Sequence, residues 1–182
     1  MPLLPPRISL RSTPRVAWLL SNQAHRRLLT CAGAATHRYG HQSEIIGLDC
    51  DHRERPITVS RDHTVRLWKV QDETHLVFRG RGSLDCCTVA GQSTWVSGAD
   101  DGALSLWGTM KKKPLMVSQG AHVATPELGA AAAWVGALAA VRGSDLVASG
   151  AADGAVRLWV RLYTVLLPSS LGFSVVLTAA VT

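Results

Sequence analysis

The stretch Asp62–Trp68, DHTVRLW, occurs in three versions in this chain of 182 residues. It returns as DGALSLW at 101–107 and as DGAVRLW at 153–159. In each copy an aspartate stands six residues before a tryptophan, and a Ser or Thr stands four residues before that aspartate. The tryptophans are 39 and then 52 residues apart. One copy could arise by chance, but three copies with the same internal offsets indicate a repeat protein.

The residues around each copy have the pattern of four short strands. First strands are expected at 45–50, 84–89 and 135–142, and second strands at 56–60, 94–98 and 146–150. The third strand carries the tryptophan, and fourth strands are expected at 75–79, 114–118 and 162–167. Turns built on Asp with His or Gly separate the second strand from the third. Four antiparallel strands per repeat make one blade of a β-propeller, so the sequence predicts an all-β protein of about three four-stranded blades.

This pattern resembles the WD40 family, whose blades are held by a hydrogen-bonded tetrad of His, Ser or Thr, Asp and Trp. The resemblance implies a complete tetrad in the first repeat, made of His41, Thr58, Asp62 and Trp68. It implies another in the third repeat, made of His122, Ser149, Asp153 and Trp159. The second repeat has Ser97, Asp101 and Trp107, but Arg81 or Gly82 stands where the histidine belongs. The second tetrad is therefore expected to be incomplete, although the blade itself is retained.

A Ser/His/Asp set also invites interpretation as a hydrolase triad. A catalytic nucleophile is present once in a chain, whereas this set recurs with each repeat and always includes a tryptophan. The sequence therefore predicts a protein that is not an enzyme and binds no cofactor and no small-molecule substrate.

The net charge of +6 is unevenly distributed along the chain. Six arginines precede Glu44, the first acidic residue, and the remaining 13 basic and 13 acidic side chains balance. The repeats therefore present no overall basic field of the kind that binds nucleic acid nonspecifically.

The four cysteines form no CxxC pair. They are interpreted as reduced packing residues of a cytosolic or nuclear protein. The stretch Asp49-Cys50-Asp51-His52 looks like a ligand cluster, but no second ligand group stands at a suitable spacing, and no metal site is predicted.

The two ends of the chain leave alternatives open. The first 43 residues are free of acidic side chains and rich in Arg, which suits either a transit peptide or a disordered basic arm, and the arm is favoured. Residues 162–182 lack charge and are long enough to span a bilayer, but Pro168 and Gly172 interrupt them, so no membrane contact is expected.

Basic side chains outside the N-terminal arm concentrate near the second repeat. Their positions are Arg79, Arg81, Lys111, Lys112 and Lys113. They are predicted as possible RNA contacts, with a merely solvated turn as the alternative.

The residues between the motifs are more specific to one family than the motifs themselves. Residues 40–49 and 97–115, and an insertion after His122 that resumes at Trp134, are similar to the family of U3 small nucleolar RNA-interacting WD-repeat proteins. The resemblance implies a non-catalytic subunit of the U3 small nucleolar ribonucleoprotein. Its implied partners are U3 small nucleolar RNA and the box C/D proteins, and its implied place is the nucleolus of the nucleus, in pre-rRNA processing and ribosome biogenesis. A generic WD40 protein–protein adaptor and a non-functional truncated gene product are the alternatives.

The expected organisation follows from these assignments. A basic, disordered arm takes residues 1–35, and the three blades take 36–79, 80–118 and 119–167. The third blade holds an insertion near 123–133, and an apolar tail over 168–182 is unassigned. Because the family has seven blades, the chain is expected to be an incomplete propeller.

Overall fold

The computed structural model describes residues 10–13, 16–20, 27–32, 34–51, 55–69, 72, 74–122, 134–141, 143–162, 165–168 and 175–176. Side chains are described for those residues that lie between 40 and 160, and the backbone alone for the others. The described residues form strands and turns, and no helix among them is long and apolar enough to cross a membrane.

The strands form four antiparallel sheets, each a meander in chain order. The first contains β1 (Leu10–Thr13), β2 (Val16–Leu20), β3 (Arg27–Ala32) and β4 (Ala34–Tyr39). The second, blade 1, contains β5 (Ile45–Cys50), β6 (Pro56–Ser60), β7 (Thr64–Lys69) and β8 (Thr74–Arg79). Blade 2 contains β9 (Leu84–Gly91), β10 (Thr94–Ala99), β11 (Leu104–Gly108) and β12 (Met116–Ser118). Blade 3 contains β13 (Val135–Ala140), β14 (Leu146–Ala151), β15 (Ala155–Leu162) and β16 (Val165–Pro168), with β17 (Val175–Val176) paired to the start of β15.

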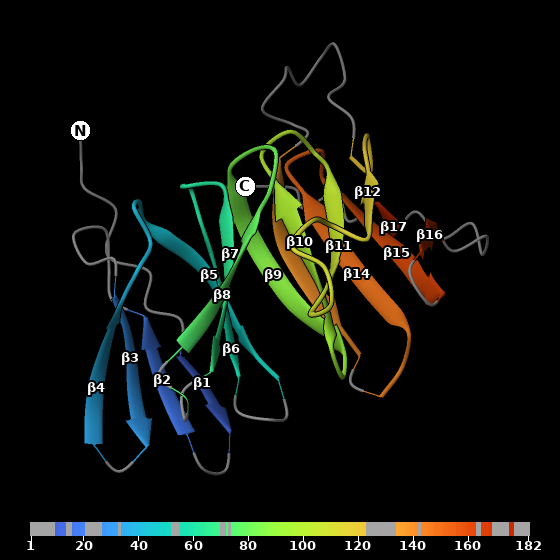
Figure 1. Cartoon of the computed structure of the whole chain (residues 1–182). Coiled ribbons are helices and arrows are strands. Elements are labelled where there is room, and N and C mark those ends of the chain that lie inside the picture. The colour runs from blue at the N-terminus through green and yellow to red at the C-terminus, as the bar shows by residue number, and fades with distance from the viewer. Residues whose placement is uncertain are drawn as a thin grey trace, which may run out of the picture.

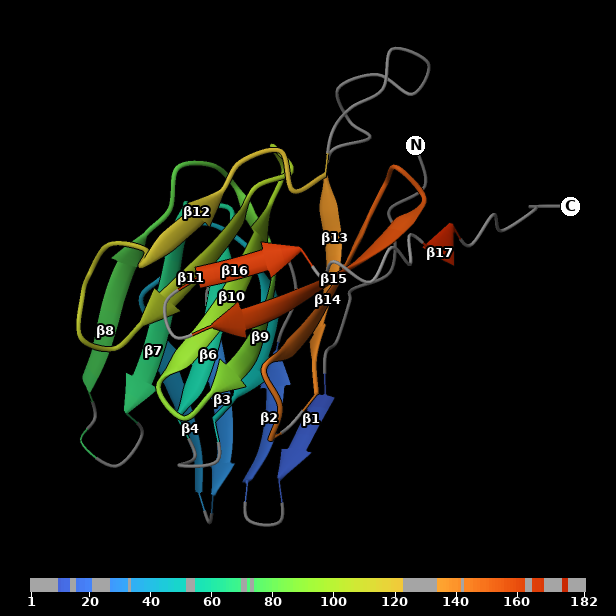
Figure 2. The same cartoon turned by 90° about the vertical axis from the view of Figure 1, so that its right-hand side faces the viewer.

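The four sheets lie side by side as a fan (Figure 1). The first strand of each sheet contacts the first strand of the next, so that β1, β5, β9 and β13 line its inner side. The view turned by 90° shows the sheets stacked face to face (Figure 2). This is the arrangement of blades in a β-propeller, and the all-β prediction is confirmed.

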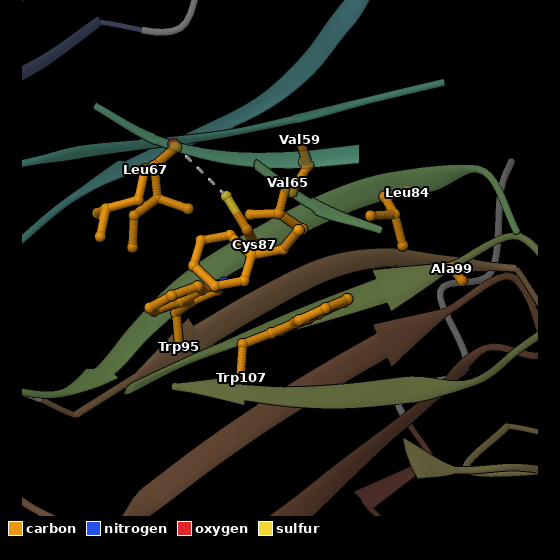
Figure 3. Close-up of a cluster of buried hydrophobic side chains, with 10 residues drawn as sticks. Val59, Val65, Leu67, Leu84, Cys87, Trp95, Ala99 and Trp107 are labelled. Carbon is orange, nitrogen blue, oxygen red and sulfur yellow. Dashed lines mark hydrogen bonds between the residues drawn. The ribbon is translucent and has the colours of Figure 1, made fainter. Parts of the chain in front are cut away.

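The core lies between the blades. Ile57, Val59, Val65 and Leu67 of blade 1 pack against Trp95 and Trp107 of blade 2, and each is at most 2% exposed (Figure 3). Phe78 meets Trp95 edge to face, with 4.9 Å between the ring centroids. Aliphatic side chains on one sheet and indoles on the next give a dense, dry interface.

The structure differs from the sequence-based expectation at the N-terminus. The predicted disordered arm over residues 1–35 is wrong where the structure describes it, because β1, β2 and β3 and part of β4 lie there. The predicted start of blade 1, residue 36, falls inside β4, which belongs to the preceding sheet. This segment is rich in Arg and free of acidic residues, and it carries no copy of the Asp-to-Trp motif.

Smaller differences concern the ends of strands. The fourth strand of blade 3 begins at Val165, because β15 continues to Leu162. The fourth strand of blade 2 begins at Met116 instead of Pro114, consistent with the missing N–H of proline. The predicted insertion at 123–133 and most of the tail lie outside the described residues.

Candidate functional site: the blade tetrads and the basic surface

The first tetrad is a continuous chain of hydrogen bonds. The indole N–H of Trp68 donates to Thr58 Oγ1 over 2.8 Å, and His41 Nε2 lies 2.7 Å from the same oxygen. His41 Nδ1 lies 2.9 Å from Asp62 Oδ2. Because Thr58 accepts from the indole, its own hydrogen is available for His41 Nε2, and Nδ1 then carries the ring hydrogen that Asp62 accepts. All four polar groups are satisfied with a neutral imidazole.

The carboxylate of Asp62 also fixes the turn in which it stands. Its oxygens accept from the backbone N–H of Gln42 over 2.8 Å and of Thr64 over 3.0 Å. One side chain therefore holds the β4–β5 connection and the β6–β7 turn together. Gly40 stands before the histidine, and a Cβ there would displace the flexible end of the Arg66 side chain.

The third repeat has the same geometry. His122 Nδ1 lies 2.9 Å from Asp153 Oδ2 and Nε2 lies 2.7 Å from Ser149 Oγ, which accepts from the Trp159 indole over 2.8 Å. The Arg157 guanidinium adds a donor to the same Asp153 oxygen over 2.6 Å. The structure thus brings together both complete tetrads implied by the sequence.

The second repeat keeps the bond between Trp and Ser of its tetrad but lacks the histidine. The Trp107 indole donates to Ser97 Oγ over 2.8 Å, and Asp101 accepts from the N–H of Ala103 over 3.0 Å. Arg81 is exposed and Gly82 has no side chain, so neither replaces the imidazole. The incomplete tetrad expected from the sequence is what the structure shows.

Burial and hydrogen bonding shift the ionisation of both tetrads. Burial lowers the pKa of His41 to about 4, against the raising effect of Asp62. The pKa of Asp62 falls to about 2, because hydrogen bonds from Thr64 and Gln42 and the nearby His41 outweigh its burial. Burial likewise lowers the pKa of His122, and the pKa of Asp153 falls through bonds from Ala155, His122 and Arg157. At neutral pH each pair is a neutral imidazole beside a carboxylate.

The tetrad hydroxyls are out of reach of a substrate. Thr58 and Ser97 are 0% exposed and Ser149 is 1% exposed. A nucleophile must contact its substrate. These groups are therefore suited to holding strands together and not to acyl transfer.

A contact that sequence reasoning missed joins blade 1 to blade 2. Asp49 on β5 accepts from the backbone N–H of Val89 on β9 over 2.8 Å and lies 3.3 Å from the hydroxyl of Thr88. The sequence analysis weighed Asp49 only as part of a metal cluster, and no motif marks it as a bridge between sheets. Among the described residues no group of His, Cys, Asp and Glu could hold a metal ion. Cys86 is a buried thiol whose pKa rises to about 12 through burial, which makes it chemically inert.

The predicted basic residues are all exposed, but the structure does not bring them together. Arg79 pairs with Thr64 at the end of blade 1 that carries the β6–β7 turn. Arg81 lies in the next loop, near the β10–β11 turn, where Asp100 N–H donates to Ser83 O. The three lysines, Lys111–Lys113, follow β11 at its other end. The strand β11 separates the two groups, so they form two surfaces and not one.

A cavity of about 460 Å³ opens beside the inner strands, at the same end of the fan as the lysines. Its lining includes the carboxylates of Asp49 and Asp145, and no Lys, Arg or His is among the described residues that line it. Negatively charged walls repel phosphate, so this hollow is not suited to RNA.

The comparisons with known proteins agree with this fold and with these tetrads. The family described as "WD domain, G-beta repeat" matches residues 33–69 and 125–160. U3 snoRNP-associated protein-like EMB2271 of Arabidopsis thaliana is 40% identical over 129 residues, 66% of this chain and 27% of the relative. U3 small nucleolar RNA-interacting protein 2 of Homo sapiens is 44% identical over 89 residues, 48% of this chain and 19% of the relative. The chain thus spans about a quarter of the length of the first of these, and less of the second.

Two solved structures resemble most of this chain. The structure of U3-55K has a TM-score of 0.73 and 34% identity, covering 84% of this chain and 48% of its own. The crystal structure of RRP9 WD40 repeats has a TM-score of 0.77 and 33% identity, covering 88% of this chain and 51% of its own. The recurring tetrads, the stacked four-stranded sheets and these matches lead to one conclusion: the chain contains WD40 repeats and is similar to U3 snoRNP-associated WD-repeat proteins.

Proposed function

We propose that this chain is a non-catalytic scaffold of a U3 small nucleolar ribonucleoprotein, acting in pre-rRNA processing in the nucleolus. The observation that carries the proposal is the 40% identity over 129 residues to a U3 snoRNP-associated protein. The buried tetrads support the role of a scaffold, because their polar groups are hydrogen-bonded to one another within the blades. Its partners under this proposal are U3 small nucleolar RNA and box C/D proteins.

The RNA contact of this proposal is the turn of Lys111–Lys113. Its three side chains are exposed and adjacent, and the neighbouring Met110 is 92% exposed, so the whole turn projects from blade 2. Ammonium groups in a projecting turn can reach phosphates without desolvating a buried site. Each phosphate contact adds about one unit to the dependence of log affinity on log salt.

Filter binding of U3 small nucleolar RNA over a range of salt concentrations tests this proposal. Changing Lys111, Lys112 and Lys113 together to alanine should weaken binding and reduce the salt slope by about three units. The matched control is the double change of Arg79 and Arg81 to alanine, which removes charge at the opposite end of the blades and should leave the slope nearly unchanged. Equal binding by wild type and the triple variant would remove the RNA role from this turn. Failure of the wild-type chain to retain U3 RNA over an unrelated RNA would remove the scaffold proposal itself.

A further inference from the structure

The connection between the third and fourth strands is longest in blade 2. Residues 163–164 join β15 to β16, and residues 70–73 join β7 to β8, whereas residues 109–115 join β11 to β12. The three connections also differ in charge, since they read YT, VQDE and TMKKKPL. We call residues 109–115 the lysine turn. It is specific to one blade and is not a property of the repeat.

Both ends of the lysine turn are fixed to blade 2. The N–H of Thr109 donates to Ser93 O over 3.2 Å, and the N–H of Leu115 donates to Leu106 O over 2.8 Å. Leu115 also packs on Gly108, where a Cβ would lie 2.9 Å from Leu115 Cδ1. The residues between these anchors therefore project from a base that is held at both ends.

The projecting part of the lysine turn combines an apolar side chain with adjacent cations. Met110 is 92% exposed, the highest value among the large hydrophobic side chains that the structure describes. Lys111, Lys112 and Lys113 are exposed, and no ion pair of the described residues involves them. Blade 2 has a neighbour on each side in this chain, so blades that the structure describes set this exposure. The apolar and the charged groups are both open to a partner.

RNA offers both kinds of group that such a surface can bind. Ammonium groups contact phosphates, which positions a protein on the RNA but does not read the bases. The thioether of methionine is polarisable and packs favourably against aromatic rings, with the sulfur about 5 Å from the ring. Stacking covers the base faces inside an RNA helix, whereas unpaired bases can be splayed out and packed against side chains. Met110 can therefore contact the face of a base only where the nucleotide is unpaired.

The other exposed large hydrophobic side chains of the described residues lie near carboxyl groups. The Trp134 indole is hydrogen-bonded to Asp85, and Val141 lines the cavity that also contains the carboxylate of Asp145. A carboxylate repels a phosphate brought close to it. Met110 is thus the one among them that stands beside cations and is suited to RNA.

We propose that Met110 binds the face of an unpaired base of RNA while Lys111–Lys113 contact the phosphates beside it. This inference rests on the proposed RNA contact of the lysine turn and adds the class of RNA that the turn takes. That class is a loop, a bulge or a single strand, and not a continuous duplex.

Filter binding of U3 small nucleolar RNA, and of the duplex that the same RNA forms with its full complement, tests this proposal. Met110→Ala should weaken binding of U3 RNA by about twofold to tenfold, because the contact with the base is lost. It should leave duplex binding and the salt slope unchanged, because it removes no charge. Met110→Leu keeps an apolar side chain of similar size and should retain most of the affinity. Val141→Ala, which removes another exposed apolar side chain, is the matched control and should bind both RNAs as the wild type does.

A photoreactive diazirine residue placed at position 110 identifies the nucleotides in contact. Stops of reverse transcription map the crosslinked nucleotides, and chemical probing of the free RNA shows which nucleotides are unpaired. Crosslinks at unpaired nucleotides are the expected result. Crosslinks confined to paired stems would overturn the proposal.

The variants separate failure of this inference from failure of the proposed function. If the triple lysine change lowers the salt slope but Met110→Ala leaves the affinity for U3 RNA unchanged, the turn contacts only phosphates. The inference is then wrong, although the proposed function stands. If the wild type does not retain U3 RNA over an unrelated RNA, both are wrong. If poly-glutamate displaces U3 RNA as well as unlabelled U3 RNA does at equal charge, the turn binds acidic protein, and the inference is again wrong.

Discussion

The hydroxyl of Thr58 is the residue on which the first tetrad depends, because it both accepts from Trp68 and faces His41. Thr94 provides a contrast within the same fold. Its Oγ1 is buried and has no hydrogen-bond partner among the described residues. The same chemical group therefore stabilises the fold at one position and contributes little at the other.

Replacing each threonine by valine should separate these two cases. Thr58→Val keeps the shape but leaves the Trp68 N–H and His41 Nε2 buried without partners, and should lower the free energy of unfolding by roughly 2–4 kcal/mol. Thr94→Val should change it by no more than about 0.5 kcal/mol. Urea unfolding followed by tryptophan fluorescence measures both. Similar losses in the two variants would contradict the assigned hydrogen-bond chain.

The buried histidines make stability depend on pH in a defined window. Above the ordinary histidine pKa of 6.5 both the folded and the unfolded chain are neutral at His41. Below it the unfolded chain takes up a proton that the folded chain refuses until about pH 4, so stability falls as the pH falls. The loss from His41 should reach about 3 kcal/mol by pH 4, and His122 adds to it in the same direction.

Urea midpoints measured between pH 7 and pH 4 check this expectation. His41→Gln should be less stable at pH 7 and should show a weaker decline toward pH 4. Asp62 adds little to this decline, because its depressed pKa gives a stabilisation that is present above the ordinary value of 3.8 and is lost only as the pH falls below it. A wild-type midpoint that does not change across the window would show that the imidazoles are not held neutral.

Recurrence explains which of these residues could be predicted from the sequence. Thr58, Asp62 and Trp68 reappear with fixed offsets in the third repeat, and His41 reappears as His122 before a longer connection, so their roles follow from the pattern. Asp49 carries no such signal, because the equivalent position in blade 2 is Thr88 and the bond to Val89 exists only when two sheets meet. Contacts between sheets depend on how the sheets pack, and the repeat pattern of the sequence does not show which residues meet there.

At the scale of elements, the turn after each tetrad aspartate sets the strand pairing. The residue that follows the aspartate has a left-handed backbone in all three copies, with φ of 63° at His63, 79° at Gly102 and 74° at Gly154. Such values suit glycine and strain other residues. The Asp-Gly and Asp-His pairs were therefore correctly interpreted as turns between the second and third strands.

Gly154→Ala isolates the backbone preference of this turn. A Cβ at Gly154 would meet nothing within 4 Å, so only the left-handed φ opposes the change. The free energy of unfolding should fall by about 1 kcal/mol. Gly136→Ala is the control, because it too has open space but no left-handed φ, and it should stabilise the chain by about 0.5 kcal/mol. Thermal melting of both variants compares them, and equal effects would show that φ is not the deciding factor.

The first sheet shows where element prediction failed. The strands from Leu10 to Tyr39 lack the Asp-to-Trp motif and have no acidic residues, so composition pointed to an arm. Strands of four to six residues carry little periodic signal of their own. Their partner is blade 1, and the sequence between residues 1 and 39 does not reveal that partner.

At the scale of the whole molecule, the distance between blades is set by small residues on the facing strands. A Cβ at Gly98 would lie 2.6 Å from Val135 Cγ1 and 2.8 Å from Cys86 Sγ. Glycine at this position allows blade 3 to approach blade 2 closely.

Gly98→Ala should therefore push two blades apart. Overpacking of a dense interface lowers the free energy of unfolding by about 1–3 kcal/mol. Val135→Ala removes the nearest of the opposing atoms, and the double variant should lose less stability than the sum of the two single changes. A double-mutant cycle from urea unfolding gives the coupling, and strict additivity would show that the two positions do not press on each other.

The boundaries of the sequence repeat differ from the boundaries of the sheets. The first family match begins at residue 33 and ends at residue 69, so it takes the last strand of one sheet, His41, and the first three strands of the next. This segment therefore holds all four members of a tetrad, with the histidine in the connection and the hydroxyl, carboxylate and indole in the sheet that follows. A gene that grows by copying this segment adds a blade already clamped to its predecessor. The joint between blades is inherited within the copied unit and need not evolve afresh.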